Sequence, residues 1–250
     1  MHLNNRQQSI LALLQRHNAI SVADLSEQLY FSPSTVRRDL ETLEKENLLR
    51  RTHGGAALVA DKNAEIPLDV RTGDNRAAKE AIARAAAGFV TDGDSLFMDS
   101  SSTVLRMLPY LAGRKDLTVI TNGLKTAGEL ARHHGIRTVC TGGVLRERSL
   151  SFIGHHARAV LSGYNVNKLF FSARAISPEK GVSDIDADEA ELRRIMLRGA
   201  ERAFVLMDAS KLDTLSLCHI CGIGEVDALV TDAPLRGAGK WGAVEVLLAT

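Results

Sequence analysis

Two short hydroxyl side chains and two arginines stand together near the start of this sequence. They are Ser34, Thr35, Arg37 and Arg38. Val36, Leu40 and Leu43 recur at helical spacing and can be buried, which leaves the polar set on the opposite side, near the helix N-terminus. Arginines that bind guanine and hydroxyls that contact bases or phosphates are what a helix needs in the major groove. The pattern fits such a helix, or an ordinary capped surface helix.

The neighbouring segments favour the interpretation of this helix as one that reads DNA. The spacing predicts a helix over residues 6–17, a short extended link at 19–20, a second helix that Ser21 caps, and a third helix from Ser32 to about residue 46. Residues 48–52 read as a strand, 53–55 as a tight turn and 56–58 as a returning strand. Three short helices and a hairpin predict a winged helix-turn-helix, with Arg50, Arg51 and His53 holding the DNA backbone.

Charge limits where a nucleic acid can bind. The 250 residues carry 31 Lys+Arg and 30 Asp+Glu, so any DNA-binding surface must be local. Within residues 1–57, four of the seven basic side chains form two adjacent pairs, one in the third helix and one in the hairpin. There is no run of about 18 apolar residues and no apolar core of a signal peptide near the N-terminus. Three cysteines do not suggest a disulfide framework, and we expect a cytoplasmic protein without a membrane partner.

A second pattern begins after residue 73. Residues 59–73 contain no helical repeat and predict a linker between a domain at 1–58 and one at 74–250. Residues 77–89 predict an alanine-rich helix, and short apolar runs then alternate with helical stretches. The runs are 96–98, 117–120, 137–140, 169–171, 204–207 and 228–231. This alternation predicts an α/β domain with a mostly parallel sheet and helices on both faces.

Small polar clusters follow these runs, where ligands of parallel sheets bind. The clusters are Asp99-Ser100-Ser101-Ser102-Thr103, Thr121-Asn122-Gly123, Thr141-Gly142-Gly143 and Asp208-Ala209-Ser210-Lys211. Hydroxyls and unpaired N–H groups at a helix start suit an anion, although one such cluster alone is explained equally well by helix capping. Two neighbouring clusters, with Asp208 and Lys211 on the same sheet, favour a ligand pocket.

These segments resemble the DeoR family of bacterial transcription regulators. The reading helix Ser32–Leu40 and the wing Leu49–Ala56 carry the resemblance over residues 6–57, and the strand-end clusters carry it over about 75–235. The resemblance implies a sensor domain similar in fold to ribose-5-phosphate isomerase and glucosamine-6-phosphate deaminase, and a phosphorylated sugar or related metabolite as effector. The implied ligand-binding residues are Asp99, Ser100, Ser101, Ser102, Thr103, Thr121, Asn122, Gly142, Gly143, Glu189, Asp208 and Lys211.

The sequence departs from the family pattern at several positions. Ser101, Ser172 and Ala175 stand where glycines are expected, and Arg174 adds a charge. Cys218-His219-Ile220-Cys221 lacks a second ligand pair, so we expect a structural strand and no metal. His133-His134 and His155-His156 are expected at solvated helix positions, and most of the acidic stretch 184–191 at a solvated helix start.

The sequence therefore predicts a DNA-binding regulator of a carbohydrate operon, a repressor, that binds operator DNA as a homo-oligomer and has no catalytic residue and no cofactor. Two alternatives stay open. The second domain can be a sugar-phosphate isomerase or deaminase, with a carboxylate and Lys211 moving protons, or a vestigial pocket in a regulator that senses its partners.

Overall fold

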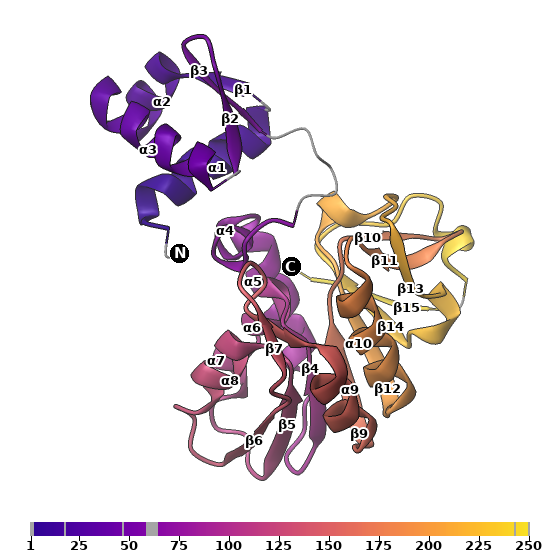
Figure 1. Cartoon of the computed structure of the whole chain (residues 1–250). Coiled ribbons are helices and arrows are strands. Elements are labelled where there is room, and N and C mark those ends of the chain that lie inside the picture. Colours follow the sequence, from indigo (N-terminus) through magenta and orange to yellow (C-terminus); the bar gives the residue numbers. More distant parts are fainter. Residues whose placement is uncertain (1–2, 18, 47, 59–64, 243, 250) are drawn as a thin grey trace. The chain divides into compact units, whose positions relative to one another are not determined.

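The computed structural model describes residues 3–17, 19–46, 48–58, 65–242 and 244–249 (Figure 1). The chain divides into two compact units, Met1–Asp74 and Asn75–Thr250.

Unit 1 has the elements that the sequence predicts for a winged helix-turn-helix. They are α1 (Asn5–His17), β1 (Ala19–Ser21), α2 (Val22–Leu29), α3 (Pro33–Lys45), β2 (Leu49–Thr52) and β3 (Gly55–Leu58). The side chain of Ser21 caps α2 by accepting from the Asp24 N–H, and that of Ser32 caps α3 by accepting from the Thr35 N–H. The apolar faces of the three helices share one core, in which Val36, Leu40 and Leu43 are fully buried.

The wing is a three-stranded antiparallel sheet in the order β1-β3-β2. Its turn needs glycine at two successive positions. Gly54 has a φ of +92°, and a Cβ on Gly55 would lie 2.3 Å from the Ile20 carbonyl oxygen of β1. The predicted tight turn at 53–55 is therefore confirmed, and the glycines also let β1 lie against the wing.

The segment predicted as a linker is partly helical. Residues 59–64 lie outside the described residues, but α4 (Leu68–Gly73) follows them. Leu68 and Val70 are buried, and Val70 belongs to the core of unit 1. The helix has only six residues, too few to show a periodic pattern, so it could not be predicted from the sequence.

Unit 2 is built on a seven-stranded parallel sheet in the order β15-β14-β12-β9-β4-β5-β6. The strands are β4 (Ser95–Met98), β5 (Leu117–Thr121), β6 (Ile136–Cys140), β9 (Val166–Phe171), β12 (Ala200–Leu206), β14 (Ala228–Thr231) and β15 (Glu245–Leu248). Six of them are the predicted runs. The order reverses between β4 and β9, and such a switch point is where open α/β sheets bind ligands.

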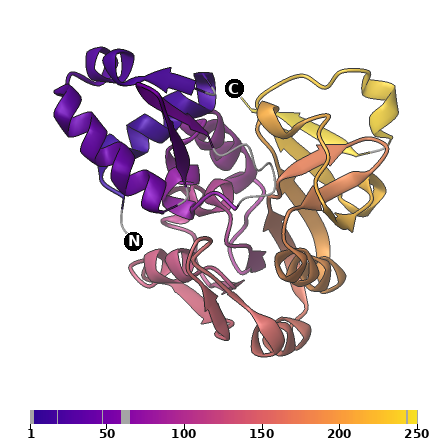
Figure 2. The same cartoon turned by 45° about the horizontal axis from the view of Figure 1, so that its top comes forward.

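Helices cover both faces of this sheet (Figure 2). Buried residues of α5 (Arg76–Ala87), α6 (Ser102–Leu105), α7 (Leu108–Leu111) and α8 (Leu124–Leu130) form one core, and those of α9 (Gly154–Ser162) and α10 (Ala187–Arg198) form the other. Within β4, Leu96 and Met98 belong to the first core and Phe97 to the second. Successive strand residues are thus apolar because both faces are buried.

Three parts of unit 2 are not in the predicted pattern. The hairpin of β7 (Val144–Arg146) and β8 (Ser151–Ile153) follows β6. A small antiparallel sheet joins β10 (Ala175–Ser177), β11 (Gly181–Asp184) and β13 (Cys218–Cys221). The edge strand β15 pairs in parallel with β14. The strand predicted at Cys218–Cys221 is confirmed, although it lies outside the main sheet.

Candidate nucleic-acid interface and effector site

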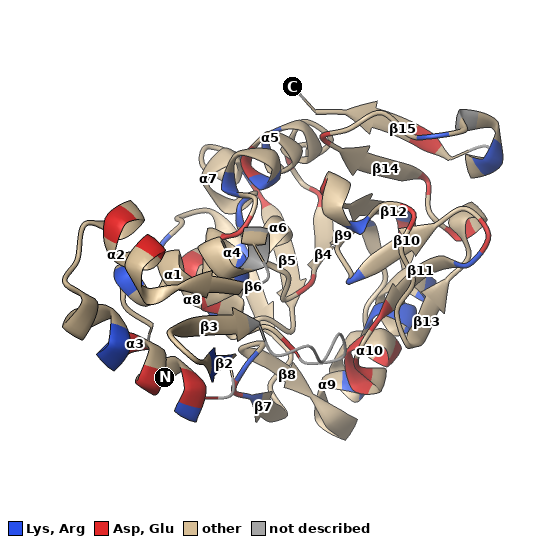
Figure 3. Ribbon diagram, turned by 90° about the horizontal axis from the view of Figure 1, so that it is seen from above, with Lys and Arg blue, Asp and Glu red and all other residues tan. Residues whose placement is uncertain are grey.

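The exposed side of α3 carries the predicted DNA-reading residues. Ser34, Arg37 and Arg38 are exposed, while Val36 and Leu40 on the opposite side are fully buried. Figure 3 marks the basic residues of α3 in blue. Within the described part of the chain, the guanidinium group of neither arginine has a hydrogen-bond or ion-pair partner. The helix therefore presents two free guanidinium groups, with the geometry to bind guanine or phosphate through two hydrogen bonds.

Hydroxyl groups gather at the N-terminus of α3. The Ser32 Oγ lies 3.0 Å from the Ser34 Oγ and 2.9 Å from the Thr35 Oγ1. Ser34 is free to turn toward a ligand because it is exposed, whereas Thr35 is partly covered. These hydroxyls and the positive end of the helix dipole favour an approaching phosphate.

A buried carboxylate fixes the orientation of this helix. Asp39 is 4% exposed and accepts hydrogen bonds from the Arg6 guanidinium and, at 3.3 Å, from the Gln7 Nε2. Arg6 also lies over the Phe31 ring, 4.9 Å from its centroid. The start of α1 and the turn before α3 are thereby tied to α3, and the sequence interpretation missed Asp39 because its partners lie 32 and 33 residues away.

The wing residues divide into two groups. Arg50 and His53 are exposed, and their side chains have no hydrogen-bond or ion-pair partner among the described residues. Arg51 instead pairs with Glu41 of α3, with 3.1 Å between Nη1 and Oε1, and its backbone N–H donates to Glu44 at 2.9 Å. Arg51 thus braces the wing against α3, and DNA would have to compete with Glu41 for it.

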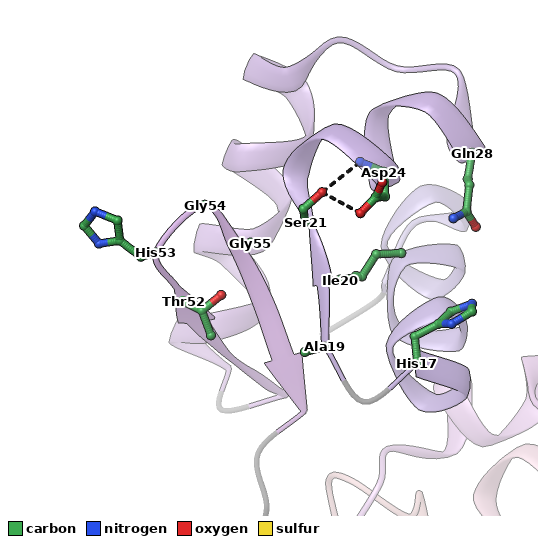
Figure 4. A pocket seen from close by; sticks show the side chains of 10 residues that line it. All are labelled: His17, Ala19, Ile20, Ser21, Asp24, Gln28, Thr52, His53, Gly54 and Gly55. Atoms are coloured by element: carbon green, nitrogen blue, oxygen red, sulfur yellow. Dashed lines mark hydrogen bonds between the residues drawn. The ribbon is translucent and has the colours of Figure 1, made fainter.

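A hollow of about 400 Å³ lies beside the wing, between β1 and the start of α2 (Figure 4). His53 is among the residues that line it, and Ser21 accepts from the Asp24 N–H at 3.1 Å and donates to the Asp24 carboxylate at 2.6 Å. Because Asp24 is negative and Ser21 already caps the N-terminus of α2, the hollow is a poor place for a phosphate.

In unit 2, the loop after β4 lies at the switch point and is almost completely buried. Its five residues, Asp99, Ser100, Ser101, Ser102 and Thr103, are each at most 4% exposed. The Asp99 carboxylate accepts from the Ser101 N–H at 2.9 Å, the Ser172 N–H at 3.2 Å and the Arg193 Nε at 2.9 Å. Asp99 was predicted to bind ligand, but these contacts occupy its carboxylate and hold the loop in place.

Arg193 of α10 is the centre of a buried charge network. Besides Asp99, its Nη1 lies 3.1 Å from Asp184 and 3.6 Å from Glu189, whose carboxylate also accepts from Ser151. Burial raises the pKa of Glu189 above its ordinary 4.5, and Arg193 offsets this only in part. Burial alone would lower the pKa of Arg193, but the three carboxylates hold it above its ordinary value.

This network corrects the prediction for the acidic stretch 184–191. Asp184 and Glu189 pair with Arg193, Asp186 caps α10 and pairs with Arg146, and Glu191 pairs with Arg158. The stretch does start a helix, as predicted, but these carboxylates are not simply solvated, because each of them meets a cation from its own or a neighbouring element. His133 and His134 also differ from the prediction: they lie in the turn after α8, while His155 and His156 are exposed on α9 as expected.

The loops after three neighbouring strands each contain a buried polar atom without a partner. These atoms are the Thr103 Oγ1 after β4, the Asn122 Oδ1 after β5 and the Thr141 Oγ1 after β6, unpaired among the described residues. The side chains of Thr121 and Asn122 are otherwise engaged, with the Gly123 N–H at 3.0 Å and the Phe152 carbonyl at 3.4 Å. An unpaired buried polar atom costs free energy that a ligand can recover.

The two glycines after Thr141 have different reasons to be glycine. Gly142 has a φ of +61° with open space around it, whereas a Cβ on Gly143 would lie 2.6 Å from the Ile153 carbonyl oxygen. Gly143 therefore lets β8 approach. The Phe152 N–H donates to the Asn122 carbonyl at 2.7 Å, so the hairpin joins the loops after β5 and β6.

The last predicted cluster joins the same edge through Ser172. The Lys211 Nζ donates to the Ser172 Oγ at 3.0 Å, and the Ser172 N–H binds Asp99. Asp208 accepts from the Asn75 Nδ2 at 3.0 Å. Burial alone would raise the pKa of Asp208, but Lys211, Ser210 and Lys79 hold it below its ordinary 3.8. Lys79, Asn75 and Ser172 were not predicted as part of the site, since single polar residues outside a cluster carry no signal.

Comparison with known proteins agrees with both halves of this description. The DeoR-like helix-turn-helix domain family matches residues 6–62, and the DeoR C-terminal sensor domain family matches residues 74–233. The chain belongs to the DeoR family. It is thus a DNA-binding transcriptional regulator with a small-molecule sensor domain, as the winged helix and the switch-point loops indicate.

Members of the DeoR family align along nearly their whole length. The chain is 38% identical to the uncharacterized HTH-type transcriptional regulator YulB of Bacillus subtilis, over 95% of this chain and 92% of that protein. It is 36% identical to the transcriptional repressor AccR of Agrobacterium fabrum, over 93% and 90%. It is 29% identical to the glycerol-3-phosphate regulon repressor of Escherichia coli, over 94% and 92%.

One of the similar solved structures is ribose 5-phosphate isomerase A from Methanocaldococcus jannaschii. It aligns over 56% of this chain and 55% of its own, with a TM-score of 0.42 and 19% identity. The described residues contain no helix long and apolar enough to cross a membrane, and no cluster of three or more histidine, cysteine or acidic side chains that could hold a metal ion.

Proposed function

We propose that the protein represses a carbohydrate operon and is released from its operator by a phosphorylated sugar or related metabolite. The observation that carries the proposal is the group of unpaired polar atoms on Thr103, Asn122 and Thr141. These residues follow the carboxyl ends of three neighbouring strands, β4, β5 and β6, the first of which borders the switch point. The glycerol-3-phosphate regulon repressor among the relatives supports this class of effector.

The phosphate would bind the loop after β4, through Ser100, Ser102 and Thr103 and the N–H groups at the start of α6. Asn122, Thr121 and the Gly142–Gly143 turn would meet the hydroxyl groups of the sugar, and Asp208, Lys211 and Glu189 would border the site. Ser101 is committed to capping α6, since its Oγ accepts from the Val104 N–H at 3.3 Å. Asp99 acts through the loop rather than on the ligand.

On DNA, Arg37 and Arg38 with Ser34 and Thr35 would read the major groove, and Arg50, His53 and Arg51 would hold the backbone. A winged helix that reads one half-site calls for a second copy on the next, so we propose a homo-oligomer on a symmetric double-stranded operator. Because such a regulator works where its DNA is, we propose that the protein is cytoplasmic.

We also propose that the sensor domain is not an enzyme. Sugar-phosphate isomerisation needs a carboxylate free to take a proton from the substrate. Glu189 is held by Arg193 and Ser151, and Asp208 accepts from Asn75 and Ser210. Both carboxylates already have hydrogen-bond or ion-pair partners within the protein, so we expect no turnover of pentose or hexosamine phosphates by the purified protein.

The experiment compares Thr103→Val with Thr138→Val. Both threonines have a buried, unpaired Oγ1 and both changes remove only a hydroxyl, but Thr138 lies inside β6, away from the strand ends. Genomic footprinting supplies the operator, and fluorescence anisotropy then measures its affinity with and without a panel of sugar phosphates. We expect Thr103→Val to bind operator normally and to lose release by the sugar phosphate, while Thr138→Val responds like the parent chain.

Two results would contradict the proposal. If Thr103→Val still responds fully, the loop after β4 does not bind the effector. If no phosphorylated metabolite affects operator binding or stability of the parent chain, the pocket is vestigial and the regulator responds to something else. Arg37→Ala tests the DNA half separately, because it should weaken operator binding and relax specificity at one base position.

A further inference from the structure

One cation at the switch point is unaccounted for. Arg174 follows β9, is half-buried, and has no hydrogen-bond or ion-pair partner within the described ranges. The rest of its loop is firmly held, since the Ser172 N–H binds Asp99 and both Ala173 and Ala175 are buried. The backbone at Arg174 is therefore held in place, while its guanidinium pairs with no acidic group among the described residues.

The other cations of this edge are compensated. Arg193 is shared among Asp99, Asp184 and Glu189. Lys211 donates to Ser172, and its charge, together with that of Lys79, acts on the Asp208 carboxylate. Among the described residues of the loops that directly follow β4, β9 and β12, Arg174 is thus the cation without an opposing charge.

Arg174 is partly buried, and its guanidinium has no acceptor among the described residues that could replace the water it gives up when a ligand binds. An anionic ligand would supply the missing acceptor, and the planar guanidinium suits a carboxylate or a phosphate equally. The strand before Arg174 pairs directly with the strand before the hydroxyl loop, Met98 opposite Phe170. Neighbouring strands are about 4.8 Å apart, so the backbones of the two loops begin about one strand spacing apart, a separation that one sugar can span.

We propose that Arg174 binds a second acidic group of the effector, so that the effector is a phosphorylated sugar that carries a carboxylate or another phosphate at its other end. This inference rests on the proposed function, in which the loop after β4 takes the first phosphate. The neutral hydroxyls and N–H groups of that loop hold one anionic end, and Arg174 selects for the other.

The experiment uses two pairs of probes that differ only in the second acidic group. Glucitol 6-phosphate is compared with 6-phosphogluconate, which has a carboxylate in place of its terminal CH2OH group, and fructose 6-phosphate with fructose 1,6-bisphosphate, by calorimetry on the full chain. The variants are Arg174→Gln and, as a matched control with the same loss of charge, Arg137→Gln. Arg137 is exposed near the start of β6, at the far end of that strand from the ligand site.

We expect the parent chain and Arg137→Gln to prefer the doubly acidic member of at least one pair by about tenfold or more, the range of a charge-assisted contact. Arg174→Gln should lose that preference and keep its affinity for the monophosphate. Equal loss for both members of the pair, or an unchanged preference, would overturn the assignment while leaving the sensor function intact. If no probe binds the parent chain at all, the proposed effector class fails, and this inference fails with it.

Discussion

Replacing Arg193 with methionine should destabilise unit 2 strongly. Methionine has similar bulk and no charge, so the change removes the cation and leaves Asp99, Asp184 and Glu189 around an apolar side chain. All three carboxylates now contact Arg193, whose side chain is 5% exposed. Removing one partner from a buried ion pair costs about 3–5 kcal/mol, because the remaining charge is buried without compensation.

That cost can be measured by a signal that belongs to unit 2 alone. The chain has one tryptophan, Trp241, which is 1% exposed and lies in the same core as α10. Its fluorescence therefore follows the unfolding of unit 2. For a unit of this size each kcal/mol shifts the melting temperature by about 2–4 °C, so we expect a loss of about 6–20 °C at neutral pH.

The neighbouring residue is the control. Arg194 is only partly buried and donates to the His219 carbonyl, so Arg194→Met should cost about 1 kcal/mol, the worth of an ordinary hydrogen bond. The loss in Arg193→Met should also shrink in acid, because protonation removes the uncompensated negative charge. Equal losses in the two variants, or a loss that does not depend on pH, would refute a charge network at this site.

Three further changes test other parts of the structure. Asp39→Ala should lower the stability of unit 1 by about 1.5–3 kcal/mol and weaken operator binding, while exposed Glu27→Ala should do neither in circular dichroism and anisotropy measurements. Gly143→Ala should abolish the response to effector because its Cβ would clash with β8, whereas Gly142→Ala should cost only the strain of its positive φ, about 1–2 kcal/mol. Burial raises the pKa of Glu189, so wild-type stability should fall as pH rises from 4.5 through that raised pKa, and tryptophan fluorescence should show a flatter pH profile for Glu189→Gln.

The sequence predicted the elements whose signals are local. Ser21 and Ser32 cap the helices they were expected to cap, and the six apolar runs of the second domain became six strands of the parallel sheet. Caps, turns and buried strands depend on residues within a few positions of one another, so their pattern is visible in one chain. The edge strand β15 was missed because three of its four residues are exposed, which leaves no buried run.

Side-chain roles that depend on distant partners could not be predicted in the same way. Asp99 was placed among the ligand-binding residues, yet its partners Ser172 and Arg193 lie 73 and 94 residues away and convert it into a support for the loop. Arg51 was expected on the DNA backbone, but Glu41 ten residues before it holds its guanidinium. At both positions, a charged residue that was predicted to contact a ligand or DNA also pairs with a residue of the protein itself.

The unpaired atoms at the switch point show how a ligand could act on DNA binding. A ligand with equal affinity for two arrangements of a protein shifts nothing, however tightly it binds. Thr103, Asn122 and Thr141 are unpaired together in the arrangement described here, and pairing each is worth about 1 kcal/mol. If the effector satisfies all three in only one arrangement, it favours that arrangement by about 3 kcal/mol, or about a hundredfold. If that difference passes in full to operator affinity, it lowers the occupancy of an operator from about 90% to about 10%, and it needs no contact between effector and DNA.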